Sequence, residues 1–318
     1  MLGINLDKIG GHVGHADLCK AVTEVQKRTK DIVESTFTVA AGIVPDPERI
    51  EEIRPYAAVG LSEEIMLEHC LPFIVADAFD QIDDNILSGA GIVGGIYVAH
   101  AKVLDAIFDK ELHEPYQNSA MILSLLLYDR TLEEILTLLP PLKSKRALEA
   151  FFRYHPCQFR ALMAQSFEGK LPSFQDYRQI AQDAAEGRKI IIDLLAIAGK
   201  PRGDYNLLYS SLDSLAIANQ LIDDFMDWEE DFERNTRTYF LYQASIQLRE
   251  KITSAGNIAS VALRKSFMKD YFTRVLENYD EAASLATRAG STCLAEAINQ
   301  IATQVLTLTE IVLKECNQ

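Results

Sequence analysis

Acidic side chains recur at helical spacing in residues 219–231, which read NQLIDDFMDWEED. At about 100° per residue, the polar residues at every fourth position share one slowly drifting helix face: Asn219, Asp223, Asp227 and Asp231. Like charges at this spacing destabilise a helix unless something compensates them. A divalent cation bound by carboxylate oxygens would compensate them. An acidic face turned to solvent is the alternative interpretation.

A second group of carboxylates lies in residues 77–84, which read DAFDQIDD and have apolar sequence on both sides. On a helix, Asp77, Asp80 and Asp84 would fall within an arc of about 60°. Two such faces on two amphipathic helices could meet across a bundle. Mg²⁺ keeps several waters and binds through few carboxylates plus substrate phosphates. We therefore predict a cluster of two or three Mg²⁺ ions around a diphosphate, held by six aspartates: Asp77, Asp80, Asp84, Asp223, Asp227 and Asp231.

Composition narrows the class of partner. The chain has 318 residues, 46 acidic against 31 basic, and a formal net charge of −15. Nucleic acids and anionic membrane surfaces favour basic patches, so neither is expected to bind. The five cysteines are scattered and the N-terminus has no apolar signal core, which favours reduced thiols and a cytoplasmic location. No uninterrupted apolar run reaches 18 residues, so no integral membrane segment is expected.

Helical periodicity dominates, with no convincing alternating strand. It predicts one all-α domain over residues 1–318, a bundle whose site is built from inward-facing side chains. The expected helices cover about 15–42, 48–58, 62–112 with an interruption at the glycines of 89–95, 116–128, 131–139, 143–154, 156–168, 173–198, 205–233, 240–254, 257–287 and 291–315. Capping boxes are expected at Thr131–Glu134 and Ser173–Asp176. The glycines are expected to permit close helix contact or to widen a cavity.

A departing diphosphate also needs hydrogen-bond donors besides the metal. Arg237 and Tyr239 follow the second acidic stretch and could close over phosphate oxygens. Arg188 and Lys189, on the preceding helix, and Arg54, ahead of the first acidic stretch, are further candidates for substrate binding. For each of them an ordinary surface role is the alternative.

Aromatic side chains near the acidic stretches could stabilise a carbocation through their ring faces. Phe73, Phe79 and Phe225 are the candidates for this role, and Phe79 and Phe225 are assigned to the substrate site. Ordinary core packing is the alternative for each.

The ordered pair of acidic stretches resembles a known family. The pattern D-x-x-D-x-x-x-D at residues 77–84, followed by D-x-F-x-D-x-E-E-D at residues 223–231, resembles the bacterial large-terpene synthases, class IB enzymes of the tetraprenyl-β-curcumene synthase type. Two D-x-x-x-D motifs, at 80–84 and 227–231, also resemble squalene and phytoene synthases. Asn219, Arg237 and Tyr239 fall where the phytoene synthase pattern has similar residues, which implies catalytic roles for them.

The resemblance implies the all-α isoprenoid synthase fold with a central cavity, and Mg²⁺-dependent ionisation of a prenyl diphosphate. There are departures from the family pattern. Residues 190–199 read IIIDLLAIAG and keep only the Ala-Gly of the head-to-head synthase signature, which favours a terpene synthase. Asp224 stands where the large-terpene pattern commonly has tyrosine, and with it residues 223–227 also spell the DDxxD of linear polyprenyl diphosphate synthases.

The sequence therefore predicts a terpene synthase that ionises a long-chain prenyl diphosphate, releases diphosphate and forms a linear or cyclic terpene. A head-to-head or chain-elongating prenyltransferase is the first alternative. A non-catalytic helical protein that binds prenyl diphosphates is the second. The oligomeric state, a homodimer among the options, is left open.

Overall fold

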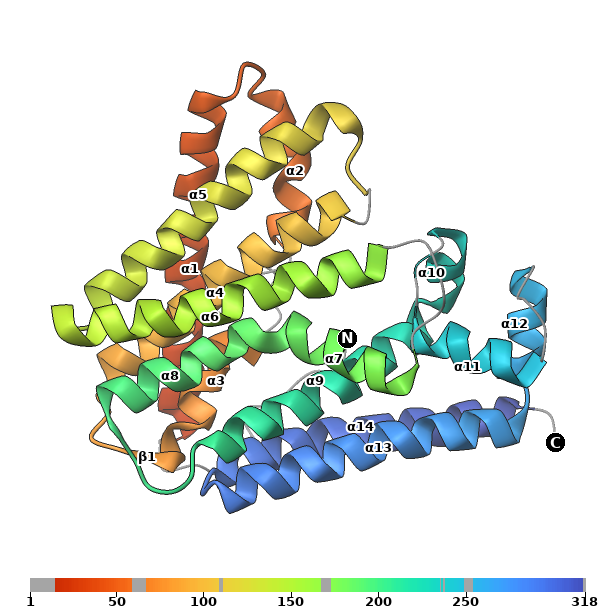
Figure 1. Ribbon diagram of the computed structural model, residues 1–318. Helices are drawn as coiled ribbons and strands as arrows, with labels where there is room; N and C mark the ends of the chain where they lie inside the picture. Colours follow the sequence, from red (N-terminus) through yellow and green to blue (C-terminus); the bar gives the residue numbers. More distant parts are fainter. Residues whose placement is uncertain are drawn as a thin grey trace.

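The computed structural model describes residues 15–58, 67–108, 111–166, 173–234, 236, 238–248 and 254–316. Helices make up almost all of this part of the chain (Figure 1). Their bounds are α1 His15–Ile43, α2 Glu48–Ala58, α3 Leu67–Ile74, α4 Asp84–Phe108, α5 Glu114–Leu138, α6 Pro141–Ser166, α7 Phe174–Ala185, α8 Lys189–Ala198, α9 Asn206–Met226, α10 Trp228–Arg234, α11 Tyr239–Leu248, α12 Ala255–Ala262, α13 Lys265–Arg288 and α14 Thr292–Glu315.

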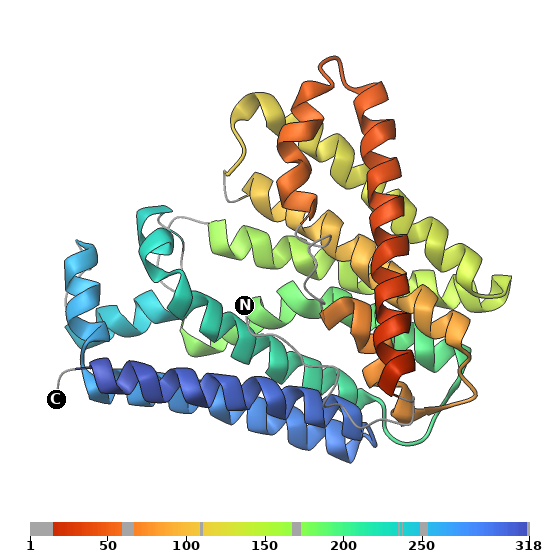
Figure 2. The same cartoon turned by 180° about the vertical axis from the view of Figure 1, so that it is seen from behind.

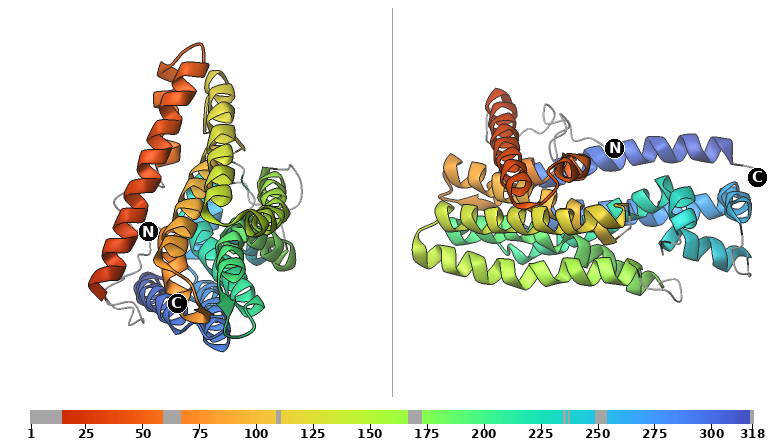
Figure 3. Two further views of the ribbon diagram at one scale, coloured as in Figure 1. Left: turned by 90° about the vertical axis from the view of Figure 1, so that its left-hand side faces the viewer. Right: turned by 90° about the horizontal axis from the view of Figure 1, so that it is seen from above.

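The helices surround α4. Seen from the side, α4 runs between α1 on one side and the pair α6 and α8 on the other (Figure 3). The long helices α13 and α14 lie side by side along α9 and form the opposite layer, which is in front in the rear view (Figure 2). One continuous core of buried apolar side chains joins the two layers, so the predicted all-α bundle is confirmed.

The glycines of α4 serve close packing, and the predicted interruption of the helix there is wrong. α4 is continuous through residues 89–95. A Cβ at Gly91 would lie 2.9 Å from the carbonyl oxygen of His69, and one at Gly94 would lie 2.7 Å from the side chain of Ile191. Glycine costs helix stability, and here that cost is offset by the close approach of α3 and α8.

Two helix boundaries were predicted wrongly from local signals. Thr131 lies inside α5, where its hydroxyl donates to the carbonyl of Leu127 at 3.0 Å, so it begins no helix. Pro156 lies inside α6, so 141–166 is one helix rather than two. The break at Pro140 is confirmed. The capping box at Ser173 and Asp176 is also confirmed, since each side chain bonds the other residue's backbone N–H.

The first acidic stretch is not helical, which contradicts the predicted helix face. α3 ends at Ile74, and a 3-10 turn, η3 (Ala76–Ala78), follows it. The strand β1 (Phe79–Asp80) then pairs antiparallel with β2 (Lys200–Pro201). Asp84 is the first residue of α4, so the three aspartates lie in three different elements.

The second acidic stretch begins as predicted but breaks once. α9 ends at Met226, and Asp227 leaves the helical conformation with φ −108° and ψ 10°. α10 starts at once with Trp228. Asp223 and Asp227 therefore lie at the end of one helix, and Asp231 lies on the next.

α4 is long and apolar enough to cross a membrane, as the one such helix among the described residues. However, 67% of its most apolar window is buried inside the bundle. The apolar character of α4 is thus explained by its central place in the core.

Candidate functional site at the ends of α4 and α9

The carboxyl of Asp77 accepts hydrogen bonds from residues at the start of α14. Its Oδ1 accepts a hydrogen bond from the hydroxyl of Ser291 at 2.8 Å. Its Oδ2 accepts from the hydroxyl of Thr292 at 2.9 Å and from the backbone N–H of Cys293 at 3.0 Å. The first N–H groups of a helix lack partners within the helix, so Asp77 acts as a cap for α14.

The other two aspartates of the first stretch also stand apart from a common site. Asp80 Oδ1 accepts from Arg202 Nε at 2.7 Å, and this ion pair is half exposed. Asp84 is exposed at the first turn of α4, where a negative charge is favourable. The neighbouring Asp83 accepts the backbone N–H of Ile86 at 2.9 Å. Each carboxylate therefore has a local structural explanation.

The two acidic stretches lie at opposite ends of α9 (Figure 1). Asp80 is bonded to Arg202, four residues before α9 begins, whereas Asp223 and Asp227 lie where α9 ends. A rise of 1.5 Å per residue separates the ends of this helix by roughly 30 Å. The structure thus does not bring the two predicted metal-binding faces together.

Charged side chains of α4 act on the second stretch. The pKa of Asp223 is raised by partial burial and by the negative charges of Asp227 and Asp105, and is lowered in part by Lys102. Lys102 and Asp105 lie in the last two turns of α4 and form an ion pair of 3.2 Å. Carboxylates from two helices therefore approach one another at the carboxyl ends of α4 and α9.

Asp223 is accessible to solvent and also surrounded by protein. The residue is exposed, yet the loss of solvent around its carboxylate is the largest cause of its raised pKa. The Asp223 carboxylate is therefore open to a ligand, although neighbouring protein atoms reduce its hydration.

Ion pairs of Arg234 hold α10 beside the end of α4. Arg234 Nη1 lies 2.8 Å from a carboxylate oxygen of Glu111, which follows α4, and Arg234 also pairs with Glu230 on its own helix. Through these contacts α10, which carries Asp231, is held next to the end of α4.

Sequence reasoning missed Asp105. The signal was present, since residues 105–109 read DAIFD, a D-x-x-x-D that directly follows a long apolar helix pattern. Asp109 lies outside the described residues. What concealed the motif was the denser run of acids at residues 77–84.

The predicted phosphate-binding cations are mostly engaged elsewhere. Arg54 pairs with Glu34 and with Glu51, and its guanidinium lies 4.6 Å from the ring centre of Phe37, so it joins α2 to α1. Arg188 Nε bonds the buried Glu68 at 2.7 Å and thereby joins the turn before α8 to α3.

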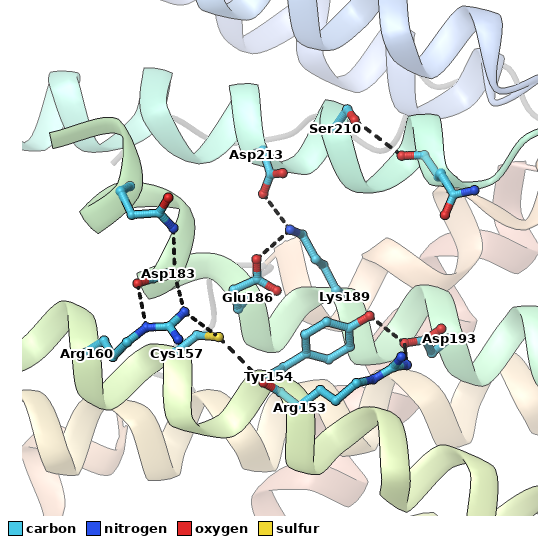
Figure 4. Close-up of polar contacts among 12 residues, drawn as sticks. Arg153, Tyr154, Cys157, Arg160, Asp183, Glu186, Lys189, Asp193, Ser210 and Asp213 are labelled. Atoms are coloured by element: carbon cyan, nitrogen blue, oxygen red, sulfur yellow. Dashed lines mark hydrogen bonds and ion pairs between the residues drawn. The ribbon is translucent and has the colours of Figure 1, made fainter. Parts of the chain in front are cut away.

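Lys189 belongs to a polar network between α6, α8 and α9 (Figure 4). Its ammonium lies 2.6 Å from Glu186 and 2.8 Å from Asp213, and it is nearly buried. In the same network the carboxylate of Asp193 accepts the hydroxyls of Tyr154 at 2.7 Å and Tyr209 at 2.6 Å. These groups satisfy one another, so Lys189 stabilises the helix packing in this structure.

The remaining candidates lie on the side of α9 that faces α13 or in the core. The amide oxygen of Asn219 accepts the hydroxyl of Tyr279 at 2.7 Å. The ring of Phe225 packs edge-on against Phe272 at 5.0 Å, and Phe79 is buried in β1. Their positions fit ordinary packing, the alternative interpretation for the two phenylalanines.

Tyr239, predicted to reach phosphate oxygens, is the first residue of α11 and is buried. Its hydroxyl accepts a hydrogen bond from Gln243 Nε2 at 2.7 Å. Arg237 lies outside the described residues.

The donor set at the ends of α4 and α9 fits a hard cation. Asp105, Asp223 and Asp227 offer carboxylate oxygens whose mutual repulsion a cation would relieve. Among the described residues no three His, Cys, Asp or Glu side chains already form a closed metal site. Mg²⁺ does not require one, because it binds through one or two carboxylates together with substrate phosphates and water.

The fold resembles that of known polyprenyl synthases. A geranylgeranyl pyrophosphate synthase of Corynebacterium glutamicum superposes with a TM-score of 0.67 at 11% identity, over 94% of this chain and 96% of that one. The FPPS of T. brucei gives 0.62 at 14% identity over 90% and 99%. A polyprenyl synthase of Roseobacter denitrificans gives 0.56 at 14% identity over the same shares. The chain therefore has the isoprenoid synthase fold.

No protein-family model matches the sequence. No curated protein matches it either.

Proposed function

We propose that this protein is a Mg²⁺-dependent enzyme that ionises a prenyl diphosphate at the carboxyl ends of α4 and α9. The observation that carries the proposal is that the negative charges of Asp105 on α4 and of Asp227 both act on Asp223 at the end of α9, inside an isoprenoid synthase fold. Lys102 compensates these like charges only in part, and the remaining repulsion destabilises the folded chain, so the arrangement is best explained by a cationic ligand.

In this proposal the residues have separate roles. Asp105, Asp223 and Asp227 would hold Mg²⁺, with Asp231 on α10 as a further candidate, and a bound Mg²⁺ would act as a Lewis acid toward the diphosphate leaving group. Lys102 would place a positive charge beside the same oxygens. Arg237, predicted from sequence, remains a candidate donor to the diphosphate. The first acidic stretch has no place in this site.

The proposed reaction is that of a terpene synthase, which handles a single diphosphate. A chain-elongating enzyme must bind a second diphosphate, and this requires further cations. Among the described residues near the end of α4, Lys102 pairs with Asp105 and Arg234 pairs with Glu111. This pairing favours a substrate with one diphosphate.

Chain elongation is the second candidate, because the structural neighbours named above are synthases of geranylgeranyl pyrophosphate and polyprenyl products by their names. A shared fold at 11–14% identity does not choose between the two reactions.

The test is diphosphate release from allylic prenyl diphosphates of fifteen to thirty-five carbons, with Mg²⁺ and with EDTA, followed by mass analysis of extracted products. Terpene synthase activity predicts a hydrocarbon or alcohol that forms with Mg²⁺ alone. Chain elongation predicts a longer diphosphate that forms only when isopentenyl diphosphate is added. Absence of diphosphate release across the whole panel would contradict the proposal.

A further inference from the structure

Asp224 follows Asp223 directly, yet its side chain points into the core. Only 2% of the residue is exposed, whereas Asp223 is accessible. Successive residues on a helix point about 100° apart. Asp223 can therefore face α4 while Asp224 faces the opposite layer of the bundle.

Both oxygens of Asp224 are already used by the protein. Oδ1 accepts a hydrogen bond from Gln220 Nε2, one turn earlier on α9, at 3.2 Å. Oδ2 accepts the backbone N–H of Tyr239 at 2.8 Å. A carboxyl that is buried and occupied in this way is not available to a metal ion, although the DDxxD pattern would assign it that role.

The bond to Tyr239 closes a loop. Tyr239 is the first residue of α11, where backbone N–H groups lack helical partners and an acceptor oxygen can satisfy one of them. The bond joins the last turn of α9 to the first turn of α11 across fifteen residues of chain. All of α10 lies within this loop.

Aromatic rings from α7 and α13 pack against Tyr239 at the start of α11. The ring of Tyr239 lies 5.3 Å from that of Tyr177 on α7 and 6.3 Å from that of Tyr271 on α13. The hydroxyl of Tyr271 donates to the carbonyl of Leu221 at 2.7 Å, at the same turns of α9. The end of α9 is therefore bonded to both α11 and α13.

We propose that Asp224 is a positioning residue that fixes α10 and the end of α9, and with them the orientation of Asp223, Asp227 and Asp231. It holds the start of α11 and binds no metal. This inference rests on the proposed function for the role of those carboxylates, and on the two hydrogen bonds of Asp224 for the clamp itself.

The adjacent aspartates provide a matched pair for the test. Hydrogen exchange at the Tyr239 amide is measured in the metal-free protein, and thermal stabilisation by pyrophosphate with Mg²⁺ is measured in parallel. Asp224→Ala should accelerate exchange at Tyr239 by about tenfold or more and reduce the stabilisation. Asp224→Asn keeps an acceptor oxygen, and should preserve both the slow exchange and the stabilisation.

Asp223→Asn should show the reverse pattern, with slow exchange at Tyr239 and no stabilisation by pyrophosphate and Mg²⁺. Loss of the stabilisation in Asp224→Asn, as in Asp223→Asn, would make Asp224 a ligand and overturn the inference. Unchanged exchange at Tyr239 in Asp224→Ala would overturn it as well; if that variant does not fold, Asp224→Asn still decides. Wild-type protein without stabilisation but with slow exchange would count against the proposed function alone.

Discussion

The molecule has two acidic regions of similar composition and opposite character. In residues 77–84 three aspartates have structural partners: Asp77 caps α14, Asp80 pairs with Arg202 and Asp83 caps α4. At the end of α9, burial and the nearby negative charges of Asp227 and Asp105 instead raise the pKa of Asp223. The difference shows that the partners of a carboxylate indicate its role better than the density of acids along the sequence.

The largest expected effect is a loss of activity in variants of the second acidic region and not in variants of the first. Asp223→Asn and Asp227→Asn each remove a proposed ligand charge, and we expect Mg²⁺-dependent diphosphate release to fall by about 1000-fold. Asp80→Asn and Asp84→Asn should remain within about threefold of wild type, because surface ion pairs contribute little. Steady-state kinetics on the best prenyl substrate measures both. Equal losses in the two pairs would remove the distinction.

A second prediction tests whether α4 supplies the partner of α9. Asp105→Asn should lower kcat by about 100-fold and weaken stabilisation by Mg²⁺ with pyrophosphate. Asp129→Asn, an exposed acid on α5, is the matched control and should behave as wild type. Wild-type kinetics in Asp105→Asn would place the metal site elsewhere.

The fold class and the second acidic region were predictable from the sequence, because helical periodicity and four-residue spacing are local signals. The role of residues 77–84 could not be predicted in this way. The spacing argument assumes that these residues are helical, whereas the helix before them, α3, already ends at Ile74. The partners that explain Asp77 lie more than 200 residues away, in Ser291, Thr292 and Cys293. Asp105 could be read as part of a D-x-x-x-D motif, but its approach to Asp223 is a tertiary property.

The structural role of the first region should appear as stability. Asp77→Ala leaves the hydroxyls of Ser291 and Thr292 and the N–H of Cys293 without their acceptor, and should lower the free energy of unfolding by about 2–3 kcal/mol. Chemical denaturation measures the change. The catalytic rate per folded molecule should stay at the wild-type value, and a loss of that rate without a loss of stability would contradict the assignment.

The last prediction concerns the pH dependence of stability at the end of α9. Burial raises the pKa of Asp224 to about 8, above its value near 3.8 in the unfolded chain. The folded state then binds more protons between these values, so its stabilisation is complete below about pH 4 and is lost as pH rises toward 8. The slope for one proton is at most about 1.4 kcal/mol per pH unit.

Denaturation curves of the metal-free protein at pH 5, 6, 7 and 8 give this slope. In Asp224→Asn the contribution disappears, so the variant should gain stability relative to wild type as pH rises. An Asp80→Asn control should keep the wild-type slope, because Asp80 is half exposed. Parallel curves for wild type and Asp224→Asn would contradict the prediction.

The central claim is that the carboxylates at the ends of α4 and α9 hold the metal. Electron paramagnetic resonance can count bound Mn²⁺ in the presence of pyrophosphate, in wild type and in two double variants, Asp223→Asn with Asp227→Asn and Asp80→Asn with Asp84→Asn. We predict that the first double variant loses the bound Mn²⁺ and that the second retains it. Retention in the first and loss in the second would contradict the account.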